Sequence, residues 1–124
     1  MELNPEVDLS VNVANLHAEL RNFPLVLYRY SCYKADVEKK RDIAKAKLKE
    51  IRAVTRKRIK GYNSVKHTEN SLEAEIDTDP TVLEVQRRFI EAEHDAATWA
   101  GAVESMRAKK DMLVQLSADS RKEK

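Results

Sequence analysis

Helix-breaking residues are almost absent from this chain, which has two glycines and three prolines among its 124 residues. Sandwiches and barrels depend on many tight turns, and tight turns depend on these residues, so both architectures are disfavoured. Ala, Leu, Lys, Glu and Arg dominate instead, a composition typical of long helices. The sequence therefore predicts a single all-α domain.

The few breakers divide the chain into segments. Pro24 suits the first turn of a helix, because its missing N–H is not needed there, and Gly61 marks the expected end of that helix. Asp79 and Pro80 form a second helix start, as cap and first-turn residue. The expected elements are an N-terminal arm with a short helix capped by Ser10 (1–22), a long basic helix (24–60), a connection with a short helix (61–79), a C-terminal assembly helix (80–116) and a polar tail (117–124).

Both long segments carry apolar residues spaced alternately by three and four, as in helices that bury one face against another helix. This pattern predicts a long antiparallel helical hairpin or coiled coil. One hairpin encloses little core, so the remaining apolar surface predicts assembly into a homo-oligomer. The small residues around Gly101 would allow a helix of another copy to approach closely. The residues expected at the assembly surface are Phe89, Ala96, Trp99, Gly101, Val103, Met106 and Leu113.

Positive charge is concentrated in residues 39–60, which hold eleven basic side chains against Asp42 and Glu50. Along a helix, many of these side chains recur every three or four residues and line one stripe, where like charges repel. A polyanion would relieve this repulsion, because each phosphate neutralised also releases counterions. The predicted nucleic-acid-binding residues are Arg41, Lys45, Lys49, Arg52, Arg56, Lys57, Arg58, Lys60 and, as a base-stacking ring, Tyr62.

Two other interpretations of the stripe stay open. The stripe is also compatible with a solvated face, or with a face paired to acidic residues of the other long helix. An antiparallel hairpin could bring such acids close to it. These acids are Glu84, Glu91, Glu93 and Asp95.

Signals for catalysis, cofactors and membranes are missing. Gly61 and Gly101 stand too far apart for a phosphate-cradling loop, and the Glu91-x-x-His94 pair lacks the second copy that a di-iron site needs. We therefore expect no enzymatic activity, no metal and no cofactor. The longest apolar run is too short to cross a bilayer, and the acidic N-terminus does not look like a signal peptide. The single cysteine, Cys32, fits a reducing intracellular compartment and is expected to be a small apolar packing residue.

Three stretches together resemble the UvsY-type recombination mediator proteins of tailed phages. The first is Thr55-Arg56-Lys57-Arg58-Ile59, which resembles the family's Leu-Lys-Ala-Arg segment, although Thr55 replaces the leucine and Lys57 the small residue. The second runs from Glu69 to Val82-Leu83. The third is Gly101-Ala102-Val103-Glu104-Ser105-Met106-Arg107, which is similar to part of the family's C-terminal assembly helix.

The resemblance implies a non-enzymatic loader in the host-cell cytoplasm. Such a protein binds single-stranded DNA, with Arg56 and Arg58 in the family's basic positions, and assembles into a small ring. It also engages a RecA-like recombinase and a single-strand-binding protein, and helps the recombinase displace that protein. A structural coiled-coil adaptor or scaffold, whose basic face binds an acidic protein, is the alternative.

Overall fold

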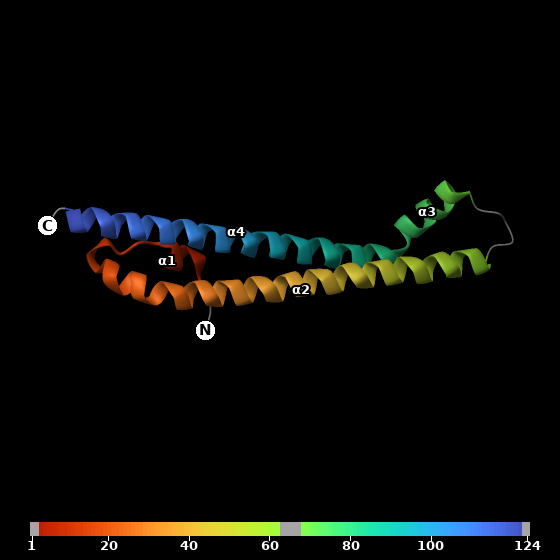
Figure 1. The fold of residues 1–124 in the computed structure, drawn as a ribbon. Helices are drawn as coiled ribbons and strands as arrows, with labels where there is room; N and C mark the ends of the chain where they lie inside the picture. The colour runs from red at the N-terminus through yellow and green to blue at the C-terminus, as the bar shows by residue number, and fades with distance from the viewer. Residues whose placement is uncertain (1–2, 63–67, 123–124) are drawn as a thin grey trace. The chain divides into compact units, whose positions relative to one another are not determined.

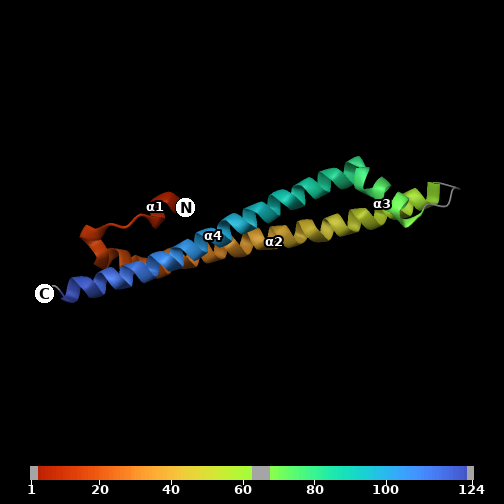
Figure 2. The same cartoon turned by 90° about the horizontal axis from the view of Figure 1, so that it is seen from above.

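The computed structural model describes residues 3–62 and 68–122, and within these ranges it contains helices and no strand. The elements are α1 (Pro5–Leu9), a 3₁₀ turn (Val13–Asn15), α2 (Leu16–Tyr62), α3 (Glu69–Thr78) and α4 (Pro80–Lys122). The all-α prediction is confirmed for the described residues. Figures 1 and 2 show these elements along the chain.

The chain divides into two compact units. The first comprises Met1–Asp36 and Ala96–Lys124, and the second comprises Val37–Asp95. Segments of α2 and α4 contribute to each unit, and within each they pack with opposite chain directions (Figure 1). The predicted packing of one long helix against another is thereby confirmed.

The core of the first unit joins the beginning of α2 to the end of α4. Its buried residues are Phe23, Tyr30, Val103, Met106 and Leu113. The N-terminal arm packs onto this core and is held by polar contacts as well. The Tyr30 hydroxyl donates to Asp8 Oδ2 at 2.5 Å, and the buried ammonium of Lys109 donates to the Asp8 carbonyl at 2.5 Å.

The core of the second unit depends on α3. Leu72 and Ile76 of α3 and Val82 of α4 are buried, and apolar residues of α2 pack against them. Both helices begin at the residues that cap them. Thr68 Oγ1 accepts from the Ser71 N–H at 3.1 Å, and Asp79 caps α4, with Pro80 as its first residue, as the sequence predicts.

Several predicted helix boundaries differ in the structure. The break expected between residues 22 and 24 is absent, because α2 begins at Leu16 and runs through Pro24. Proline inside a helix loses one hydrogen bond, and here the neighbouring Phe23, only 5% exposed, anchors the same stretch in the core. The N-terminal boundary also changes, since Ser10 follows α1 and its hydroxyl donates to the Val7 carbonyl at 2.6 Å instead of capping a helix that leads to residue 21.

A further difference is at the C-terminal end of α4, which continues to Lys122 and does not end at residue 116. The predicted polar tail is helical over its described residues. Basic Arg121 and Lys122 occupy the last turn, where positive charge interacts favourably with the helix dipole. Gln115 and Asp119 add a side-chain hydrogen bond of 3.0 Å across one turn.

Candidate nucleic-acid interface

Within the second unit, α2 places the basic residues on a continuous helix with no glycine or proline before Gly61. The helix therefore presents the basic side chains at regular intervals, as predicted. They fall into two chemically different groups. The arginines near the end of α2 contact acids of α3 and its C-cap, whereas the lysines are exposed.

The first group, which we call the arginine clamp, consists of Arg52, Arg56 and Arg58. Arg52 contacts Glu73 at 2.8 Å and Asp77 at 2.9 Å through its two terminal nitrogens. Arg56 also pairs with Glu73, and it approaches Glu69 at 3.3 Å. One face of α3 thus supplies carboxylates at four-residue spacing to two arginines at the same spacing on α2.

Arg58 completes the clamp by pairing with Asp79, the residue that caps α4. Burial alone would raise the pKa of the Asp79 carboxyl. The backbone N–H groups of Val82 and Thr81, together with the Arg58 guanidinium, outweigh this and lower the pKa below its ordinary value. Asp79 therefore stays ionised, and one carboxylate serves both the helix cap and the arginine.

The basic stripe is paired internally in part, but with acids other than those that the sequence suggests. Glu84 and Glu91 instead bind Arg87 on their own helix, at 2.8 and 2.6 Å. Glu93 and Asp95 make no ion pair with the described residues of α2. The acids of α3 could have been found from their spacing, because Glu69, Glu73 and Asp77 recur every four residues.

The second group is the set of exposed lysines between residues 39 and 60. No carboxylate in the described part of the chain pairs with any of them, and Arg41, at the start of the stripe, pairs only with its neighbour Asp42 at 3.1 Å. The exposed lysines are Lys39, Lys40, Lys45, Lys47, Lys49, Lys57 and Lys60. Among the described residues of the second unit, these lysines are positive charges without an ion-pair partner. The side chain of Tyr62, the predicted stacking ring, lies outside the described residues.

Most residues predicted for assembly are used within a single chain. Ala96, Val103, Met106 and Leu113 are buried inside the first unit. Trp99 packs its ring against Tyr33, with centroids 4.4 Å apart, and against Tyr30 at 6.0 Å. Phe89 is half-buried in the second unit.

Gly101 differs from these residues because it is exposed on α4. Apart from its two chain neighbours and the nearby backbone of its own helix, a methyl group added at its α-carbon would meet no described atom within 4 Å. The single chain therefore gives no packing reason for this glycine. Among the described residues of the second unit, the large hydrophobic side chains that remain exposed are Ile43, Val54, Leu83 and Ile90.

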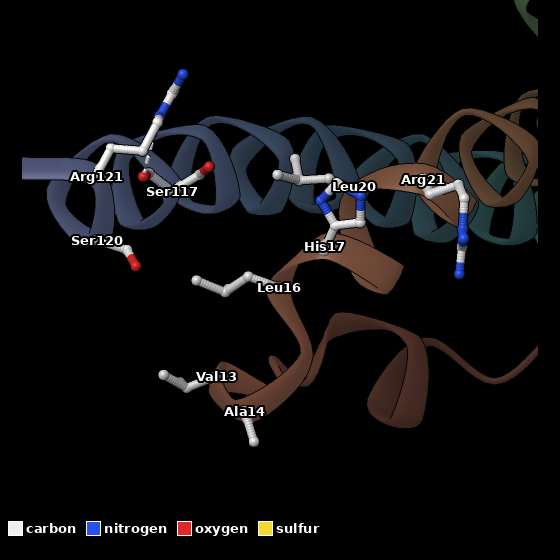
Figure 3. Close-up of a pocket in the computed structure, with 9 residues that line it drawn as sticks. All are labelled: Val13, Ala14, Leu16, His17, Leu20, Arg21, Ser117, Ser120 and Arg121. Atoms are coloured by element: carbon white, nitrogen blue, oxygen red, sulfur yellow. Dashed lines mark hydrogen bonds between the residues drawn. The ribbon is translucent and has the colours of Figure 1, made fainter. Parts of the chain in front are cut away.

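A pocket with a volume of about 890 Å³ lies in the first unit (Figure 3). Figure 3 shows the guanidinium groups of Arg21 and Arg121 at opposite sides of it, and Arg121 Nε donates to the Ser117 carbonyl at 3.4 Å. Its lining residues are Val13, Ala14, Leu16, His17, Leu20, Arg21, Ser117, Ser120 and Arg121.

The remaining candidates for chemistry are few. The described residues contain no group of three or more acidic, histidine or cysteine side chains that could hold a metal ion. Cys32 is exposed, so its predicted role as a packing residue is wrong. Its hydrogen bond with the Tyr28 hydroxyl raises the pKa of that tyrosine. Within residues 3–62 and 68–122, no helix combines the length and apolar character that a bilayer span requires.

Comparison with known proteins adds no information on function. The chain matches no protein-family model, no curated protein and no solved structure. The exposed lysines and the arginine clamp are therefore the observations on which a functional proposal must rest.

Proposed function

We propose that this chain is a non-catalytic protein that binds single-stranded DNA through the exposed lysines of α2. The observation that carries the proposal is the absence of acid partners for these lysines among the described residues, although acids are abundant in the same unit. Neighbouring ammonium groups on one helix repel each other, and phosphates would remove that repulsion. Lysine also suits a backbone contact, since it binds phosphate as a point charge.

We further propose that the arginines of the clamp have a mainly structural role, whereas the sequence predicts that they bind DNA. Arg52, Arg56 and Arg58 hold α3 and the start of α4 in place through their carboxylate pairs. In this proposal they build the scaffold on which the lysines are displayed. Their contribution to DNA binding is secondary, because each would have to exchange a carboxylate for a phosphate.

The resemblance to UvsY-type mediators extends the proposal to a biological role. The chain would then load a RecA-like recombinase onto DNA covered by single-strand-binding protein, and several copies would assemble into a small ring. A single copy offers few phosphate contacts, but linked copies bind with a high effective concentration. Assembly and DNA binding would therefore strengthen each other.

An adaptor that binds an acidic protein is the second candidate. The exposed apolar residues of the second unit favour it, because side chains such as Ile43 and Leu83 suit a protein partner better than a phosphate backbone. It would use the same lysines, so the two candidates differ in the partner and not in the surface.

Fluorescence anisotropy with a labelled oligonucleotide, in single-stranded and duplex form and at two salt concentrations, distinguishes the candidates. We expect saturable binding that weakens with salt and is tighter for the single strand. Failure to bind either form would contradict the proposal and favour the adaptor. Light scattering on the same samples tests assembly, and a monomer at all concentrations would contradict the ring.

A further inference from the structure

We propose that a groove in the second unit binds an unstacked nucleobase against Phe89, with the flanking phosphates on Lys45 and Lys49. This inference rests on the proposed function and deepens it, because it names the feature that would select a single strand over a duplex. Phosphate contacts are the same in kind for both forms, whereas only a single strand exposes the faces of its bases.

The groove lies between α2 and α4 and has a volume of about 560 Å³. Leu48, one of its lining residues, packs against the buried cluster of Leu72, Ile76 and Val82, so that this side of the groove is fixed. Phe89 approaches from α4 and is half-buried, which leaves part of its ring available. The residues lining the groove are Asp42, Lys45, Ala46, Leu48, Lys49, Arg52 and Phe89.

Charge at the rim indicates which kind of molecule fits the groove. Lys45 and Lys49 stand one turn apart, about 6 Å along the helix axis, and neither pairs with a carboxylate in the described residues. The other charged rim residues are engaged, Asp42 by Arg41 and Arg52 by its clamp acids. The groove thus combines hydrocarbon walls and an aromatic ring with two free positive charges.

A strand with splayed bases satisfies both features. A flat base can stack on the ring while its phosphates meet the two ammonium groups, and stacking does not depend on base identity. A duplex strand holds its bases stacked at a rise of about 3.4 Å and presents no base face to the ring. A second copy of this chain, or another apolar helix, would cover the groove only by burying two uncompensated charges, which is costly.

The test compares a labelled oligothymidylate with an abasic strand of equal length, which has the same phosphates and no bases. We expect the wild type to bind the oligothymidylate at least about fivefold more tightly, the order of magnitude of one stacked base. Phe89→Leu should lose that difference without changing the salt dependence. Phe89→Tyr, which keeps the ring, should restore it, and Ile90→Ala, on the neighbouring exposed position, should behave as the wild type.

The outcomes separate this inference from the proposed function. Equal binding of both strands by the wild type would overturn the stacking site and leave phosphate binding intact, whereas loss of all binding would overturn both. A Phe89→Leu variant that changes oligomer size but keeps the preference for bases would identify the groove as an interface between copies, and would also overturn the inference. Circular dichroism must show that the variants keep wild-type helicity.

Photocrosslinking with 5-iododeoxyuridine tests the location of the site independently. It should mark the peptide that contains Phe89, and crosslinks found only elsewhere would contradict the site.

Discussion

Glu19→Gln is expected to destabilise the first unit, because it removes the charge that compensates a buried ammonium. Lys109 is 8% exposed, and its Nζ lies 2.9 Å from Glu19 Oε2. The second oxygen of Glu19 accepts from the Asn12 N–H at 3.2 Å, a contact that glutamine can keep. The amide NH2 that replaces the other oxygen cannot accept from the ammonium, so Lys109 loses its ionic partner and the hydrogen bond to it, and retains the Asp8 carbonyl as acceptor.

The magnitude follows from the burial of the two partners. Removing one partner of a fully buried pair costs about 3–5 kcal/mol, and a hydrogen bond to a charged group contributes about 1.5–3 kcal/mol. Because the Glu19 side chain is 21% exposed, the lower range applies, and we expect a loss of about 1.5–3 kcal/mol. Lys109→Met, which removes the buried charge itself, should cost less, since buried ion pairs are often replaced by apolar groups with little loss.

Urea denaturation followed by circular dichroism measures both variants and the double variant. The double variant should be no less stable than Glu19→Gln alone, because an uncompensated ammonium is no longer present. A Glu19→Gln variant within about 0.5 kcal/mol of the wild type would refute the reasoning. A loss of stability of about 0.5 kcal/mol or less is typical of an ion pair on the protein surface.

Three further predictions concern the clamp, the second core and the N-terminal arm. Leu72→Ala should cost about 2–5 kcal/mol in urea denaturation, because its side chain is only 2% exposed in the core. Glu73→Gln should tighten oligonucleotide binding and steepen its salt dependence, since it weakens the pairs that hold Arg52 and Arg56; an unchanged salt slope would contradict this. Burial, followed by the hydrogen bond to a carboxylate, raises the pKa of Tyr30 above its ordinary value of 10.0. The unfolded chain loses this proton first, so stability should fall as pH rises above about 10, by up to about 1.4 kcal/mol per pH unit, and Tyr30→Phe should lack that component.

Local signals predicted the helices and one of their boundaries. The scarcity of glycine and proline was sufficient for the all-α class, and Asp79 with Pro80 located the start of α4 because capping depends on adjacent residues. Pro24 was misleading, since the cost of a proline inside a helix is offset by core packing on either side of it. Such tertiary compensation cannot be read from a local sequence signal.

The candidate site was predictable only in part. The concentration of positive charge on α2 was visible in the sequence, but its division into clamped arginines and exposed lysines depends on where α3 packs. The residues predicted for assembly show the same ambiguity. An apolar seam along a helix has the same sequence pattern whether it packs against another copy or against the same chain. Val103, Met106 and Leu113 have their partners within the first unit.

The most direct test of the central claim is the salt dependence of single-stranded DNA binding by Lys45→Gln/Lys49→Gln. If each lysine neutralises one phosphate, the slope of log K against log salt should become shallower by about 1.4, and affinity should fall roughly 25-fold at 0.1 M salt. The control, Lys110→Gln/Lys122→Gln, removes two exposed lysines of α4 and should leave both quantities unchanged. Equal slopes for the wild type and both variants would contradict the account, because the exposed lysines of α2 would then not contact the DNA backbone.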